Sequence, residues 1–244
     1  MALDLGEVET FRRARELVTD RIAAAALRAG RDPREVTLVA VSKTVPVERI
    51  RAAVAAGLTV LGENRVQEGQ HKIPEVPGAH WHLLGPLQAN KARRAVELFD
   101  VLEAVGSLEL AQRLDRIAGE VRPRRPLPVL LQVNVAGDPA KSGFDEASIA
   151  AALPALAVLP SIRLDGLMTI GRLVASAEAA RPTFRALRLL SARLRAAEPR
   201  LGPGLSMGMS GDYEVAVEEG ATIVRVGRAL FGERPVPTGQ AAEG

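Results

Sequence analysis

Residues 37–56 read TLVAVSKTVPVERIRAAVAA, and this stretch decides the fold class of the chain. Its first six residues form a short run rich in aliphatic and β-branched side chains, which predicts a buried strand. After a polar turn that contains Pro46, apolar residues from Val47 onward follow helical spacing. The stretch is therefore a strand followed by a helix, the unit from which parallel sheets covered by helices are built.

The same unit recurs along the chain. We predict strands at 37–42, 58–61, 80–84, 101–104, 129–135, 164–169, 205–209 and 222–226. Helices are predicted between them at 47–56, 65–73, 90–99, 108–120, 146–159, 178–197 and 213–219, and an amphipathic helix at about 7–29 precedes the first strand. Such alternation predicts either an open doubly wound sheet or a closed barrel. The strand count and the length of 244 residues favour a single-domain (β/α)8 TIM barrel, and no Gly-rich dinucleotide or Walker-type motif supports the open sheet.

The composition is that of an ordinary globular protein. Hydrophobic residues make up 47% and charged residues 25% of the chain, and the net charge is only +3. With 3% aromatic residues and no basic cluster between aromatics, we expect no nucleic-acid partner. The chain has no cysteine, which excludes disulfides and thiolate chemistry, and we expect no metal site. No signal or membrane-spanning run is visible, so we expect a cytoplasmic protein with one domain over 1–233 and a loosely ordered tail over 234–244.

Lys43 is the first candidate for chemistry because it directly follows the apolar run of the first predicted strand. Burial disfavours the charged form of a lysine, so its pKa falls and the neutral amine can form a Schiff base with a carbonyl. Lysine is also rare in this arginine-rich chain, and occurs only at Lys43, Lys72, Lys91 and Lys141. The alternative is that Lys43 only extends its ammonium group to solvent, as lysines at strand ends often do.

Polar residues stand at or near the ends of most other predicted strands: Ser42, Glu63, Asn64, His82, Asn134, Ser206, Ser210 and Arg225. Each taken singly has a structural explanation, such as a turn cap, a satisfied core histidine or an ion pair. In a barrel of this type, however, active sites are built at the C-terminal ends of the strands. The convergence of these side chains therefore indicates one site.

Glycines after the last two strands indicate that this site takes a phosphate. Gly208 and Gly211 flank Met209 and Ser210, and Gly227 follows Arg225 by two residues. Glycine lets backbone amides approach an anion, and barrels commonly hold phosphates at the loops after strands seven and eight. With a strand-end lysine, the ligand is a phosphorylated carbonyl compound, either a sugar phosphate or pyridoxal 5'-phosphate. Arg225 suits the second, because a guanidinium can donate to an unprotonated pyridine nitrogen.

Several motifs carry a resemblance to a known family. They are VAVSKT at 39–44, GENRVQE at 62–68, WHLLGPLQANK at 81–91, GLMTI at 166–170, LSMGMS at 205–210 and VRVG at 224–227. In this order they resemble the YggS/PROSC family of pyridoxal phosphate homeostasis proteins, single-domain relatives of the alanine racemase N-terminal barrel. The resemblance covers residues 39 to 232.

The resemblance implies a role for each candidate residue. Lys43 would hold the cofactor aldehyde as an aldimine, Arg225 would face the pyridine nitrogen, and Asn64 and His82 would lie around the ring. Ser206 and the backbone of Gly227 and Arg228 would grip the phosphate. Lys141 would belong to a loop after the fifth strand that serves as a mobile cover or a secondary ligand contact, with a plain exposed loop as the alternative. This chain departs from the family where Arg228 replaces a threonine and where Gly211 replaces a common acidic residue.

The function that the resemblance implies is that of a pyridoxal phosphate carrier or buffer in vitamin B6 homeostasis, which influences amino-acid balance without established turnover. Its partners would be the cofactor and apoenzymes that receive it, and we expect a monomer or weak dimer without membrane contact. A racemase-like enzyme is the alternative, but it needs acid-base groups on both faces of the substrate carbon, and Tyr213 is the only tyrosine to oppose Lys43. A Schiff-base aldolase acting on a sugar phosphate is a third possibility, supported only by the lysine.

Overall fold

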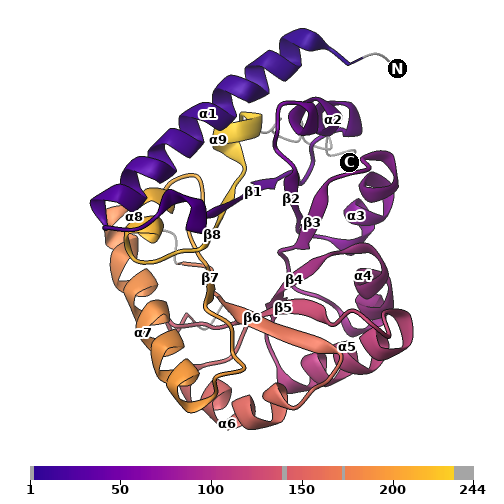
Figure 1. Ribbon diagram of the computed structural model, residues 1–244, viewed down its shortest axis with the longest axis vertical. Helices are drawn as coiled ribbons and strands as arrows, with labels where there is room; N and C mark the ends of the chain where they lie inside the picture. The colour runs from indigo at the N-terminus through magenta and orange to yellow at the C-terminus, as the bar shows by residue number, and fades with distance from the viewer. Residues whose placement is uncertain (1–2, 139–141, 172–173, 234–244) are drawn as a thin grey trace, which may run out of the picture.

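The protein folds as a closed barrel of eight parallel strands in the order β1 to β8, with β8 paired to β1. The structure is a computed structural model that describes residues 3–138, 142–171 and 174–233. Viewed in Figure 1, the strands form a central ring and the helices surround it. This confirms the predicted (β/α)8 barrel and the helix before the first strand. The predicted tail over 234–244 lies outside the described residues, as does Lys141.

The strands lie close to their predicted positions. They are β1 (Thr37–Val41), β2 (Val60–Glu63), β3 (His80–Leu83), β4 (Val101–Val105), β5 (Leu127–Gln132), β6 (Ile162–Met168), β7 (Gly204–Ser206) and β8 (Ile223–Val226). The prediction for the seventh strand, 205–209, was wrong at its C-terminal end. Gly208 has a φ of +92°, which extended backbone does not adopt, and its carbonyl instead accepts a hydrogen bond from Arg225 N at 3.0 Å.

The α-helices are α1 (Leu5–Arg28), α2 (Val47–Ala55), α3 (Val66–Lys72), α4 (Ala92–Leu98), α5 (Leu108–Val121), α6 (Glu146–Ala157), α7 (Arg181–Ala197), α8 (Tyr213–Glu218) and α9 (Arg228–Phe231). Short 3-10 turns lie at η1 (Pro33–Glu35), η2 (Ile73–Glu75), η3 (Ala89–Lys91) and η4 (Glu178–Ala180). Sequence reasoning missed α9, because four residues are too few to show helical periodicity. Within the described residues, no helix is long and apolar enough to cross a membrane.

Helix α1 is the addition to the barrel, and it lies along the outside near α8, α9 and α2 (Figure 1). Asp4 caps its N-terminus, because the carboxylate accepts hydrogen bonds from Gly6 N and Glu7 N. Phe11 on its inner face is fully buried and makes an edge-to-face contact with Phe231 of α9, with ring centroids 5.4 Å apart. The N-terminal helix is therefore packed against the element that follows β8.

The apolar core has two parts. The larger part lies between the strands and the surrounding helices and includes Trp81, Leu114, Leu131 and Phe184. A smaller cluster holds Val101, Ala104, Leu130 and Met168, with Ile170 and Ile223 packed against it. Ile223 is two residues before Arg225 on β8, and strand alternation places such residues on the same face. The smaller cluster thus fills the barrel interior beneath the polar residues of the site.

Candidate functional site

The candidate site is a pocket of about 710 Å³ at the C-terminal ends of the strands. Its lining includes Lys43 after β1, Asn64 after β2, Met168 and Ile170 at the end of β6, Met209 to Asp212 after β7, and Arg225, Gly227 and Arg228 from β8 and α9. The sequence-predicted site residues that line this pocket are Lys43, Asn64, Ser210, Gly211, Arg225, Gly227 and Arg228. His82 and Ser206 do not line it.

Lys43 lies in a tight turn that begins directly after β1. Strand β1 ends at Val41, and Val45 N donates to Ser42 O at 2.9 Å, which closes the turn around Lys43. Val41 and Lys43, two residues apart, both line the pocket, whereas the side chain of Ser42 bonds away from it to Glu63 Oε1 at 2.7 Å. The lysine itself is half-buried. Its placement at the strand end agrees with the expectation from the sequence.

Asn64 occupies the corresponding position after β2, and the loop after β3 packs tightly behind it. A Cβ atom added at Gly85 would lie only 2.2 Å from the carbonyl oxygen of Asn64, so glycine permits this close approach. The peptide oxygen is therefore held from behind, while the side chain of Asn64 lines the pocket. Asn134, another predicted strand-end residue, instead bonds within its own loop, with Nδ2 donating to Asp138 O at 2.8 Å.

A buried polar network lies beneath the pocket. Glu103 of β4 is completely buried, with Oε1 2.5 Å from His82 Nδ1 and Oε2 accepting from Ser206 Oγ at 2.5 Å. Ser206 Oγ in turn accepts from Arg225 Nη1 at 2.5 Å, and Arg225 Nη2 donates to Thr169 O at 2.8 Å. The residues come from β3, β4, β7 and β8, so the barrel joins side chains far apart in the sequence. The network fixes the plane of the Arg225 guanidinium.

The charges of this network are compensated inside the barrel. The pKa of Glu103 lies below its ordinary value. Burial by itself would raise this pKa, but the hydrogen bond from His82, the charge of Arg225 and the hydrogen bond from Ser206 together outweigh the effect of burial. Burial lowers the pKa of Arg225, and the nearby carboxylates Glu103 and Asp212 oppose that shift. The guanidinium of Arg225, only 5% exposed, stays protonated and uses two of its five N–H donors in the hydrogen bonds described.

Another part of the pocket wall is built by the loops after β7 and β8, and β8 is the strand paired with β1. Ser210 Oγ accepts a hydrogen bond from Gly227 N at 3.2 Å, which ties the two loops together. Arg228 is exposed, and within residues 3–138, 142–171 and 174–233 its side chain has no hydrogen bond or ion pair. Asp212 is the one carboxylate in the described lining, and burial raises its pKa against the opposing hydrogen bond from Met209 N and the charge of Arg225.

The predicted role of Ser206 in holding phosphate is not favoured by its position. Its hydroxyl is fully buried and already joins Glu103 to Arg225, whereas Ser210 lines the pocket beside Gly227. His82 likewise lies under the pocket, against Glu103. The roles of Lys43, Asn64, Arg225, Gly227 and Arg228 remain predictions.

Sequence reasoning missed Glu103 and Asp212. The signal for Glu103 was a single carboxylate within the otherwise apolar run VLEAV at 101–105. Tyr213, the sequence candidate for a second acid-base group, is 3% exposed, does not line the pocket, and has a pKa raised by burial. Among the described residues, no group of three or more His, Asp or Glu side chains could hold a metal ion.

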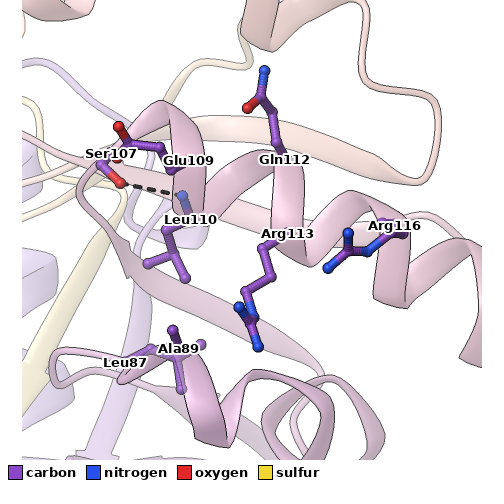
Figure 2. A pocket seen from close by; sticks show the side chains of 8 residues that line it. All are labelled: Leu87, Ala89, Ser107, Glu109, Leu110, Gln112, Arg113 and Arg116. Carbon is purple, nitrogen blue, oxygen red and sulfur yellow. Dashed lines mark hydrogen bonds between the residues drawn. The ribbon is translucent and has the colours of Figure 1, made fainter.

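A second cavity, of about 550 Å³, lies between the loop after β3 and helix α5, which follows β4 (Figure 2). Leu87 and Ala89 lie on one side, and Ser107 and Arg113 belong to α5 and its cap. Ser107 Oγ already accepts from Leu110 N at 3.1 Å, as the dashed line shows. The arginines there are exposed, and none of the sequence-predicted site residues lines this cavity.

Comparisons with known proteins agree with the fold described above. A family model described as the alanine racemase N-terminal domain matches residues 18–235. Proteins named pyridoxal phosphate homeostasis protein are similar: that of Pseudomonas aeruginosa is 46% identical over 223 residues, covering 89% of this chain and 93% of the relative. That of Vibrio alginolyticus is 42% identical over 227 residues, covering 90% and 95%. The structure of PipY from Synechococcus elongatus PCC7942 with PLP bound is 45% identical, covers 88% of this chain and 100% of that one, and superposes with a TM-score of 0.77.

Proposed function

The chain belongs to the alanine racemase N-terminal domain family and, within it, to the pyridoxal phosphate homeostasis proteins. On that premise we propose that it binds pyridoxal 5'-phosphate at Lys43 and acts as a carrier of the cofactor. The observation that carries the proposal is the pocket itself. A lysine amine, a fixed guanidinium and a glycine-rich anion site line one cavity, and each suits a different part of this one molecule.

The pocket suits the cofactor in size and in donor chemistry. A volume of about 710 Å³ falls within the range of roughly 300–1,000 Å³ typical of small-molecule sites. Pyridoxal 5'-phosphate would supply an aldehyde carbon for condensation with a lysine amine, in which a C=N bond would replace C=O and one water would leave. Lys43 is the only lysine among the described lining residues, and we assign it this role.

Arg225 serves the ring nitrogen in this proposal. The network of Glu103 and Ser206 holds its guanidinium in one orientation, and donors beyond the two hydrogen bonds described remain for the ligand. Because arginine keeps its proton, Arg225 donates to a ring nitrogen that stays unprotonated. Such a nitrogen withdraws electrons only weakly, which suits holding the cofactor rather than driving amino-acid chemistry on it.

The phosphate would be held by Ser210, Gly227 and Arg228, which line the pocket at the loops after β7 and β8. The hydroxyl of Ser210 accepts from Gly227 N, so its own proton is available to an anion in the pocket. Arg228, which the sequence resemblance places where a threonine is expected, is exposed and adds a cation to this part of the pocket. We infer that charge attraction from Arg228 replaces the hydrogen bond of the missing hydroxyl.

The second candidate function is a racemase-like activity, favoured only by the shared barrel and lysine. It needs a proton donor or acceptor opposite Lys43. Tyr213 cannot serve from its position, because it is buried and does not line the pocket. This leaves Asp212, whose pKa is raised, as the one carboxylate in the described lining that could take this role. The carrier function therefore accounts for more of the lining than the racemase does.

The experiment that tests the proposal is an absorbance titration of the purified protein with pyridoxal 5'-phosphate, followed by borohydride reduction and peptide mapping. We expect a near-ultraviolet to visible band that needs Lys43 and is trapped at Lys43. Lys43→Ala should abolish the band, and Lys91→Ala, a half-buried lysine outside the pocket, should leave it unchanged. No band in the wild-type protein would refute cofactor binding.

The carrier step is tested separately with an apoenzyme that requires pyridoxal 5'-phosphate. The loaded protein should activate the apoenzyme faster than the same amount of free cofactor. In parallel, incubation with L-alanine and chiral analysis tests the racemase. Multiple turnovers of L-alanine to D-alanine that depend on Lys43 would refute the carrier proposal in favour of the racemase.

A further inference from the structure

Lys72 on α3 is a buried lysine that the proposed binding of cofactor does not use. It does not line the pocket, and its side chain is 10% exposed. Its Nζ donates to Ser42 O at 2.9 Å, Glu63 Oε1 at 2.8 Å and Glu68 Oε2 at 2.9 Å. An ammonium group has three N–H donors, so all of them are satisfied within this cluster. Lys72 is therefore fixed in position rather than available as a nucleophile.

The contacts of this cluster reach the two residues that flank Lys43. On one side, Lys72 holds the carbonyl of Ser42, and on the other, Glu68 Oε2 accepts from Thr44 N at 2.9 Å. The same carboxylate oxygen of Glu68 bonds Lys72, so the ammonium joins both anchor points. The backbone of Lys43 is thus held before and after its Cα atom, from behind the pocket.

The turn needs such an anchor because its conformation is unfavourable by itself. Thr44 has a φ of +66°, in the left-handed region, and it is the only non-glycine residue with positive φ in the described part of the chain. A β-branched residue is rarely found there, and such conformations persist only where surrounding contacts determine them. The hydrogen bond from Thr44 N to Glu68 is the side-chain contact that holds this backbone.

We propose that Lys72 is a positioning residue that holds the turn in the conformation that presents Lys43 to the pocket. It acts directly on Ser42, and it acts on Thr44 through Glu68. The inference rests on the proposed role of Lys43 as the attachment point. A purely structural role, in which Lys72 only neutralises Glu63 between β2 and α3, makes a different prediction. Its loss would then lower stability and weaken every ligand alike.

The test compares two ligands in Lys72→Met, which keeps the length of the side chain and removes its donors. Pyridoxal 5'-phosphate reports bond formation with Lys43 by absorbance in a stopped-flow experiment. Pyridoxine 5'-phosphate, which lacks the aldehyde, reports occupancy of the pocket alone by calorimetry. We expect the bond between the aldehyde and Lys43 to form at least roughly tenfold more slowly. A displacement of a reacting group by about 1 Å can lower a reaction rate on the order of 100-fold. Affinity for pyridoxine 5'-phosphate should stay within about twofold, because the rest of the lining is unchanged.

Two further variants complete the design. Lys91→Met is the matched control and should behave as the wild type with both ligands. Glu68→Ala leaves the pair of Lys72 and Glu63 intact and removes the carboxylate that accepts from both Thr44 N and Lys72 Nζ, so it tests the same turn if Lys72→Met does not fold. It should also slow bond formation without weakening pyridoxine 5'-phosphate.

The outcomes separate this inference from the function on which it rests. Bond formation at the wild-type rate in Lys72→Met, or in Glu68→Ala where the first variant does not fold, overturns the positioning role and leaves Lys43 in place. Equal losses for both ligands also overturn it, in favour of a structural role. A wild-type protein that binds neither ligand refutes the proposed function itself.

Discussion

Replacing Glu103 with glutamine tests the buried network under the pocket most directly. The substitution keeps the shape of the side chain and removes its charge from a site with no exposure to solvent. Arg225 Nη1 lies 4.0 Å from Glu103 Oε2, which corresponds to about 4 kcal/mol of attraction at an effective dielectric constant of about 20. Breaking a buried pair typically costs about 3–5 kcal/mol, because the remaining charge stays buried. We therefore expect Glu103→Gln to lower the free energy of unfolding by about 3–5 kcal/mol at pH 7.

The assay is urea unfolding of the unliganded protein, followed by circular dichroism. Glu16→Gln, an exposed glutamate without a side-chain partner in the described part of the chain, is the control and should change stability by less than about 0.5 kcal/mol. At about 2–4 °C per kcal/mol for a chain of this size, the melting temperature of Glu103→Gln should fall by roughly 6–20 °C.

The pH dependence gives a second, independent check. The pKa of Glu103 lies below its ordinary value of 4.5, so its contribution is present above that pH and is lost as pH falls through the pKa of the folded state. The difference between wild type and Glu103→Gln should therefore shrink below pH 4.5. A loss under about 1 kcal/mol at pH 7, or one that stays constant toward acid pH, would refute the reasoning.

Three other predictions concern the scaffold. Gly85→Ala should cost about 1–3 kcal/mol and displace Asn64, because the added Cβ would lie 2.2 Å from its carbonyl oxygen; Gly211→Ala, with no heavy atom within 4 Å, should be neutral in the same thermal scan. Phe11→Ala should cost about 3–5 kcal/mol in urea unfolding, since its ring is buried between α1 and the barrel, and a near-zero cost would show that α1 is dispensable. The pKa of Glu198 is lowered to about 2 by hydrogen bonds from Arg200, so Glu198→Gln should reduce the loss of stability seen between pH 4.5 and 2; an unchanged acid profile would contradict this ion pair.

The barrel could be predicted from the sequence because its strands are buried on both faces. Runs such as TLVAV at 37–41 and LPVLLQ at 127–132 are apolar apart from one polar residue at an end, and helical spacing resumes after each turn. Boundaries were less accurate where a tertiary contact ends a strand. The seventh strand stops at Ser206 because Gly208 turns to accept a hydrogen bond from β8, and no local pattern shows that contact.

The site could be predicted in part. Lys43, Asn64, Arg225, Gly227 and Arg228 line one pocket because a parallel barrel brings all C-terminal strand ends to one side, and their roles there stay predictions. The interior partners could not be found in this way. Whether a side chain faces the pocket or lies beneath it depends on its depth along the strand, so Ser206 was predicted to contact the phosphate and instead joins Glu103 to Arg225.

The sequence by itself determined the fold class and the lysine at the end of the first strand, and it predicted an anion site, because these depend on periodicity and on short motifs. Only the tertiary structure decided which charges compensate one another. Lys72 bonds both Glu63, which is nine residues away in the sequence, and the more distant Ser42. Glu103 bonds Ser206, which is 103 residues away. A buried charge is stable only beside its partner, and closure of the barrel is what brings those partners within hydrogen-bonding distance.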